Sequence, residues 1–341
     1  MAFENSTATD PKDLLQKLVT FLVAHGWTSD RSASEGAGGW TASLHKGGVY
    51  AHFRAHLGEA TQFLNSVPDV GYSIALYLGS GFSGGAGWNG QLTGAPIQSS
   101  DAASARGVTM TLTAAAIPNY YFFTDATNDN VVVVVQKTGG VYAYLGFGTS
   151  LTKIGTWTGG PYFFGSSSGY YGHTTFGASN VPGHDLTSPC MGTAGDSFGG
   201  CCTFVRAAFD AFDGWVTVGA DALAATSAIG YCGKIGASSV GGLSGSNTLR
   251  DRIPTYIENA NWSAPGEFQT SLTSSLDGRA NLLPCLLWAE RDGSGPGFSP
   301  LGSIPNCFVC SGVGQGFSPA SDYVIGADTY KLFPYFAVLK V

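Results

Sequence analysis

Charged residues are scarce in this sequence of 341 amino acids: Asp, Glu, Lys and Arg make up 11% of it, against about 25% in an average soluble protein. The net charge is −7 and Lys and Arg form no cluster, which argues against binding to nucleic acid or to an anionic membrane. Three explanations for so few charges stay open: a surface buried largely against other subunits, an extracellular protein rich in Ser, Thr and Gly, or a β fold rich in loops.

Long apolar runs are also missing. The longest are Val131 to Val135 and the segment LLPCLLW at 282–288, far short of the about 20 residues that a membrane-spanning helix needs. The first residues, MAFENSTATDPKD, lack the basic start and apolar stretch of a secretory signal. We therefore expect a chain that folds in a cytoplasm and binds no membrane.

Cysteine is absent before position 190. An odd total of seven leaves three states open: reduced thiols buried in a core, disulfides formed after release from the cell, or a zinc site at the C-x-x-C of Cys307 and Cys310. A zinc knuckle would need a second C-x-x-C pair, which the sequence does not contain. We therefore predict no metal site, and the candidate positions for disulfides are Cys190, Cys201, Cys202, Cys232, Cys285, Cys307 and Cys310.

One stretch predicts a helix of about four turns. In TDPKDLLQKLVTFLVAHGW, Asp10 can cap the N-terminus, Pro11 fits the first helical position, and Gly26 lies where a left-handed C-terminal residue belongs. Apolar residues recur at helical spacing and predict one buried face, formed by Leu14, Leu15, Leu18, Val19, Leu22 and Val23.

Beyond this helix the apolar period changes to two, which is typical of half-buried strands. Short turns rich in Gly, Asp and Asn separate the candidate strands and favour an antiparallel meander. A short helix is expected at 202–212 and a strand at 215–219. The other expected strands lie at 40–44, 49–57, 72–78, 108–113, 119–124, 130–137, 141–147, 280–290, 307–311 and 322–338.

These patterns predict an α+β, β-dominated fold: an N-terminal helix, an antiparallel meander or sandwich, and a loop-rich insertion rich in Gly and Cys. We expect residues 1–180 to hold the helix and the main β region. Residues 181–279 would form the insertion, and residues 280–341 would return as strands to the main sheet.

Two histidines have a spacing that suggests a metal site on a helix. In GVYAHFRAHL, His52 and His56 are four residues apart, but alternation predicts a strand there, which separates them by about 13 Å. They would lie on the polar side of that strand with Tyr50 and Arg54. We therefore expect solvated or interface histidines that hold no ion.

Two motifs resemble catalytic or cofactor sites. Gly195 to Gly199 satisfies G-x-S-x-G around Ser197, but no histidine follows Ser197 as an α/β-hydrolase order requires, and no Ala-Ala-His-Cys lies upstream. Gly79 to Gly84 satisfies G-x-G-x-x-G, but the Gly, Asn and Pro that follow predict a loop. We predict no catalytic or cofactor-binding residues, while a carboxylate pair among Asp185, Asp196, Asp210 and Asp213 stays open.

Three stretches resemble a family of tailed-bacteriophage virion proteins encoded among tail and baseplate genes. They are TATDPKDLLQKLVTFLVAHGWT, then PNYYFFTDATNDNVVVVVQKTGGVYAYLGFG, and finally VCSGVGQGFSPASDYVIGADTYKLFPYF. They cover about a quarter of the chain in the family's order, and residues 181–279 align with nothing in it.

The resemblance implies a structural component of a phage tail, such as a baseplate, neck or tail-associated ring protein. Such a protein acts in the virion through contacts between its own copies, in a ring, trimer or hexamer, and with other tail proteins. Burial of its surface in such contacts would account for the low charge, because interface cores are depleted of charge and enriched in aromatic residues. The cysteines could then crosslink subunits once the particle meets an oxidising medium.

Two alternatives stay open. The first is a receptor- or carbohydrate-binding component of the same tail, since aromatic residues on Gly-rich loops could stack on sugar rings. The second is a serine hydrolase that uses Ser197. The aromatic candidates for sugar stacking are Trp88, Trp157, Tyr170 and Tyr171.

Overall fold

The chain divides into two units, which are described separately. The first comprises residues 1–150 and 161–185, and the second comprises residues 151–160 and 186–341. The computed structural model describes residues 1–35, 39–57, 72–84, 93–98, 101–112, 116–127, 129–137, 142–165, 167–170, 203–209, 212–218, 231–232, 282–290, 298–310, 317–333 and 336–340.

The N-terminal helix, α1 (Pro11–Ala24), follows the sequence prediction closely. The Asp10 carboxylate accepts a hydrogen bond of 2.7 Å from the Asp13 backbone N–H, and Gly26 takes a φ of +89° just beyond the helix. The buried face includes Phe21 in place of the predicted Val23, which is exposed. No helix in the part of the chain that the structure describes is long and apolar enough to cross a membrane.

The cap on α1 gives a testable prediction. Replacing Asp10 with Ala should lower the free energy of unfolding by about 1 kcal/mol, because a backbone N–H of the first turn loses its acceptor. Asp10→Asn is the control, since its side-chain oxygen can still accept that hydrogen bond. Urea unfolding measures both variants, and equal losses of stability would show that the cap contributes nothing.

One sheet of the first unit contains most of the predicted N-terminal strands. Its order is β13-β7-β5-β4-β3-β2, with β6 beside β7, and all its pairs are antiparallel. The strands predicted at 40–44, 49–57, 72–78 and 108–113 are confirmed. The bounds are β2 (Thr28–Glu35), β3 (Gly39–Lys46), β4 (Val49–Leu57), β5 (Tyr72–Gly79), β6 (Ile97–Gln98), β7 (Asp101–Leu112) and β13 (Ser167–Tyr170).

The other sheet of this unit contains the predicted meander. Strands β8, β9 and β10 follow one another in sequence and in space, and β1 and β12 flank them. The Val-rich strand β9 is buried along nearly its whole length rather than on alternate residues, so it resembles a central strand covered on both faces. The bounds are β1 (Ala2–Ala8), β8 (Ile117–Asp125), β9 (Asn130–Gln136), β10 (Tyr142–Gly148) and β12 (Thr158–Gly165).

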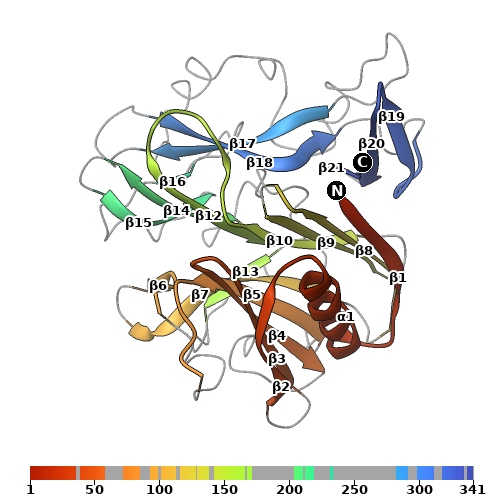
Figure 1. The fold of residues 1–341 in the computed structure, drawn as a ribbon, viewed down its shortest axis with the longest axis horizontal. Coiled ribbons are helices and arrows are strands. Elements are labelled where there is room, and N and C mark those ends of the chain that lie inside the picture. Colours follow the sequence, from red (N-terminus) through yellow and green to blue (C-terminus); the bar gives the residue numbers. More distant parts are fainter. Residues whose placement is uncertain are drawn as a thin grey trace, which may run out of the picture. The chain divides into compact units, whose positions relative to one another are not determined.

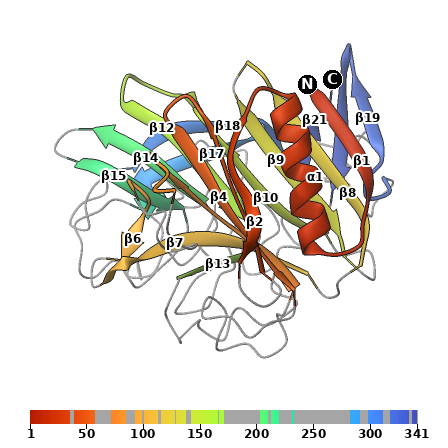
Figure 2. The same ribbon diagram turned by 60° about the horizontal axis from the view of Figure 1, so that its bottom comes forward.

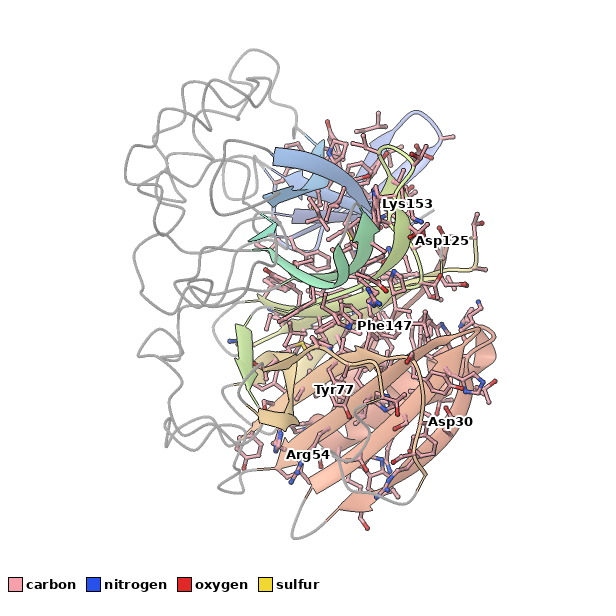
Figure 3. All side chains as sticks on the ribbon, turned by 90° about the vertical axis from the view of Figure 1, so that its left-hand side faces the viewer. Asp30, Arg54, Tyr77, Asp125, Phe147 and Lys153 are labelled. Atoms are coloured by element: carbon pink, nitrogen blue, oxygen red, sulfur yellow. The ribbon has the colours of Figure 1, made fainter. Side chains whose placement is uncertain are left out.

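The two sheets of the first unit pack face to face through aromatic residues. The ring of Phe147 on β10 contacts Phe53 on β4, with ring centroids 5.5 Å apart, and Trp27 at 5.1 Å (Figure 3). The helix α1 contacts both sheets and places Phe21 5.5 Å from Phe122 on β8 (Figure 2). The apolar face of α1 therefore fills the core between the sheets.

Glycine meets aromatic residues where β10 pairs with β12. Gly146 lies opposite Phe164, and Gly148 lies opposite Tyr162. A Cβ on Gly146 would lie 2.7 Å from Phe164 Cε1, and one on Gly148 would lie 2.7 Å from Tyr162 Cε1. The rings thus cover the glycine backbone, and the Tyr162 hydroxyl donates a hydrogen bond to the Asn130 side chain. Because these glycines and rings pack against each other, β10 and β12 pair as strands although their sequences do not alternate between polar and apolar residues.

In the second unit, residues 203–218 form a hairpin. The short helix expected at 202–212 is wrong: β14 (Thr203–Phe209) pairs along its full length with β15 (Phe212–Val218), and β16 (Tyr231–Cys232) joins β15 in parallel. Ala-rich, apolar residues at 204–209 suit either structure. Pairing with β15 favours the strand, and it includes an ion pair between Arg206 and Asp213.

The C-terminal strands form a sheet of their own, although we expected them to return to the main sheet. Its order is β11-β18-β21-β20-β19, with β17 paired to β18 (Figure 1). The molecule is thus α+β and β-dominated, with antiparallel sheets, as predicted. The bounds are β11 (Thr152–Lys153), β17 (Leu282–Glu290), β18 (Phe298–Cys310), β19 (Asp322–Ile325), β20 (Asp328–Phe333) and β21 (Phe336–Leu339).

Candidate functional site

The two histidines on the polar side of β4 are buried, which corrects the prediction of solvated histidines. His52 and His56 are each only 1% exposed, and Ser43 and Ser73 on the neighbouring strands are buried beside them. The predicted alternation is right, since Phe53 and its neighbours face the core between the sheets. Alternation separates the two faces of a strand, but it does not say which face meets solvent.

His52 lies in a stack of rings on this face. Its ring is 4.9 Å from Tyr77 on β5 and 6.4 Å from Phe82, and its Nδ1 lies 3.1 Å from the Ser43 hydroxyl. Figure 3 labels Tyr77 and its neighbour Arg54 on this sheet. Burial lowers the pKa of His52 to about 4, and the backbone of Gly81 opposes this only in part. The imidazole is therefore neutral at physiological pH.

The Ser43–His52 pair has the residue types of a hydrolytic dyad, and no sequence motif pointed to it. A serine nucleophile needs access to substrate and a base that an acid orients. Both side chains are buried, and the nearby carboxylate of Asp30 instead accepts a hydrogen bond of 2.8 Å from His45 Nδ1. We interpret the pair as a cross-strand hydrogen bond that stabilises the sheet.

No metal centre is present among the residues that the structure describes, since no three His, Cys, Asp or Glu side chains gather there. His52 and His56 both lie on the single strand β4, as predicted. Gly79 ends β5, and the backbone at 80–84 is not helical; residues 85–92, on which the predicted loop depends, lie outside the described residues. Ser197 and its G-x-S-x-G motif lie outside the described residues, as do Asp185, Asp196 and Asp210.

Two of the seven cysteines have described side chains. Cys285 on β17 and Cys307 on β18 are buried and form no disulfide. A crosslink to another subunit through either thiol would require this sheet to open. Cys232 lies on β16 and Cys310 ends β18, and the structure describes only the backbone of each. Cys190, Cys201 and Cys202 lie outside the described residues, so crosslinking there stays a prediction.

Of the aromatic residues proposed for sugar stacking, Trp157 is the one whose side chain the structure describes. Its indole N–H donates to the carbonyl oxygens of Ile154 at 3.1 Å and Leu301 at 3.0 Å. The Lys153 ammonium lies over the ring, 5.0 Å from its centre. The hydrogen bonds attach the turn after β11 to β18, and the lysine covers one face of the indole. Tyr170 lies on β13, and Trp88 and Tyr171 are outside the described residues.

An exposed apolar surface lies on the hairpin of β19 and β20. Val324 is 63% exposed and the adjacent Ile325 is 46% exposed, and both lie on β19, the last strand of its sheet (Figure 1). Sequence reasoning predicted a strand here but gave no sign of which residues it would expose. We call the outer side of β19 the β19 edge; it comprises the backbone and side chains of Asp322 to Ile325.

The charges beside the β19 edge neutralise one another. Asp322 Oδ1 lies 2.8 Å from Lys331 Nζ, and Asp322 Oδ2 lies 3.0 Å from Lys340 Nζ. Burial alone would raise the pKa of Asp322, but hydrogen bonds and charge from both lysines outweigh it and lower that pKa. On the inner face, Tyr323 packs edge-on against Phe317 at 5.1 Å. Tyr323 thus anchors one face of the hairpin, while Val324 on the opposite face and Ile325 at the end of the strand are exposed.

Comparisons with known proteins add no relative to this description. Neither the protein-family models nor the curated proteins that were compared with the chain gave a match. Among the described residues, the β19 edge is the most exposed apolar part of the surface.

Proposed function

We propose that the chain is a structural subunit of a bacteriophage tail, in the baseplate, neck or another tail-associated ring, and acts through contacts between subunits. The β19 edge carries this proposal. Exposed apolar residues on the last strand of a sheet promote association with another strand, and monomeric proteins commonly protect such edges with charge or proline. Asp322 is the charged residue of this edge and its carboxylate is paired with Lys331 and Lys340, whereas the exposed Val324 and Ile325 carry no charge.

The resemblance to tail proteins supports the same proposal. Its first stretch contains α1, its second contains β8, β9 and β10, and its third contains the β19–β20 hairpin. The last of these places the exposed edge within the part of the chain that resembles the family. The low content of charge, 11%, also fits a protein that buries much of its surface against neighbours.

A role without catalysis is part of the proposal. Among the described residues, the pair closest to a catalytic arrangement, Ser43 with His52, is buried and holds two strands together. The subunit would assemble in the host cytoplasm and remain in the virion.

Quantitative mass spectrometry of purified virions tests the proposal. We expect the chain to be present in a copy number divisible by three or six, as a ring component requires. Tail proteins of known copy number in the same particles calibrate the measurement. Absence of the chain from washed particles would refute the structural role.

A further inference from the structure

We propose that the β19 edge binds the β19 edge of a second copy of this chain, as an antiparallel two-fold contact. The inference rests on the proposed function, because it names the surface through which subunits would meet. Three features of the edge carry it: its backbone groups, its charges and its exposed side chains.

The backbone of β19 offers a short, regular set of hydrogen-bonding groups. The Leu332 N–H donates to the Ser321 carbonyl at 3.0 Å, and β19 continues this antiparallel ladder up to Ile325. Because groups alternate along a strand, Ser321, Tyr323 and Ile325 face β20. The N–H and C=O of Asp322 and Val324 therefore face the open side.

This arrangement is complementary to itself. We place a two-fold axis beside Tyr323. The N–H and C=O of Asp322 then form hydrogen bonds with the C=O and N–H of Val324 in the second copy. The symmetric pair, Val324 with Asp322 of the second copy, forms on the other side of the axis. Every backbone group on the open side of both residues then has a partner. A shift of one residue would instead place open groups against groups already bonded to β20.

The charges fit the same register. In this register the Asp322 residues of the two copies lie diagonally across the axis, with Cα atoms about 7–8 Å apart. Since Lys331 and Lys340 already pair with Asp322, no unpaired charge is buried.

The exposed side chains favour association. Val324, which is 63% exposed, lies opposite Asp322 of the second copy and diagonal to its Val324, and Ile325, which is 46% exposed, lies opposite its Ser321. Removing this apolar surface from water stabilises the contact. Because the contact is two-fold, it joins subunits in pairs. Other surfaces would be needed to complete a ring.

Light scattering after gel filtration of the full chain tests the contact. We expect the wild type to contain a dimer population, and Val324→Lys to weaken dimerisation about tenfold or more, because a lysine on an edge strand opposes strand pairing. Thr329→Lys is the matched control, since Thr329 lies opposite Val324 on β20 but away from the edge. Equal dimerisation by both variants, or a wild type that stays monomeric at every concentration, would overturn the inference.

A cysteine crosslink tests the register. Residues facing each other at the axis form a non-hydrogen-bonded pair with Cα atoms about 4.5 Å apart, within reach of a disulfide. Tyr323→Cys should therefore crosslink to itself between copies under oxidation, whereas Val324→Cys should not. Peptide mapping distinguishes this bond from those of the native cysteines. Crosslinking to another strand, or at Val324→Cys alone, would contradict the register.

The two proposals can fail separately. A chain that is present in virions but monomeric in solution and uncrosslinked at position 323 would refute the β19 contact and leave the structural role standing. A chain that dimerises through β19 but is absent from virions would refute the structural role alone.

Discussion

Gly146→Ala is expected to lower the free energy of unfolding of the first unit by about 3 kcal/mol, which is large for the addition of one methyl group. The Phe164 ring lies over Gly146, is fully buried, and stands parallel to the Tyr162 ring at 6.3 Å. Because the ring is fully buried, an added methyl group must displace it or separate the strands. Urea unfolding followed by near-UV circular dichroism would measure the loss.

Two further variants isolate the cause. Gly48→Ala is the matched control, because a Cβ there meets nothing within 4 Å, and its stability should be near that of the wild type. In a Phe164→Ala background, which itself costs about 3–5 kcal/mol, adding Gly146→Ala should cost little. Additive losses in the double variant would contradict overlap with the ring as the cause.

Acidification should destabilise the first unit through His52. Because its pKa is about 4 in the folded chain and about 6.5 when unfolded, the unfolded state binds more protons between these values. Stability therefore falls as the pH is lowered through that range, by about 2 kcal/mol between pH 7 and pH 5 and about 3 kcal/mol by pH 4. Above about pH 7.5 the residue contributes almost no pH dependence, because it is then neutral in both states.

The variant His52→Gln tests this assignment. Glutamine is neutral throughout and can still form a hydrogen bond with Ser43, so the variant should lose this part of the pH dependence. The measurement is the urea midpoint of both proteins at pH 7, 6 and 5, a range above the titration of most carboxylates. Parallel curves for the two proteins would exclude His52 as the group responsible.

Local signals predicted the regular parts of the fold well. Asp10, Pro11 and Gly26 predicted the ends of helix α1, because a helix cap depends on only a few neighbouring residues. The meander of β8, β9 and β10 was evident from short polar turns. The strand β12 was missed, because Gly159 and Gly160 give no alternation and its aromatic residues gain their role from the glycines of β10 opposite them.

Predictions failed where the outcome depends on distant segments. Residues 202–212 suit a helix by spacing, but pairing with β15 gives a strand. His52 has the pattern of an outward residue, yet Phe82 and Tyr77 lie against it. The β19 edge shows the converse case, because Val324 and Ile325 are ordinary strand residues by sequence and only the order of strands leaves them exposed.

The valine run of β9 has a consequence for how the chain folds. An uncharged, proline-free segment of strongly β-forming residues readily joins other chains when it is exposed in the unfolded state. Both partners of β9 are its neighbours in sequence, and hairpins of this kind close within about 1–10 µs. The outer strand β1 is distant from β8 in the sequence: the Asn5 side chain donates a hydrogen bond to the carbonyl oxygen of Tyr120, 115 residues later. We therefore expect β8, β9 and β10 to pair first, which would hide the valines before copies of the newly made chain can aggregate.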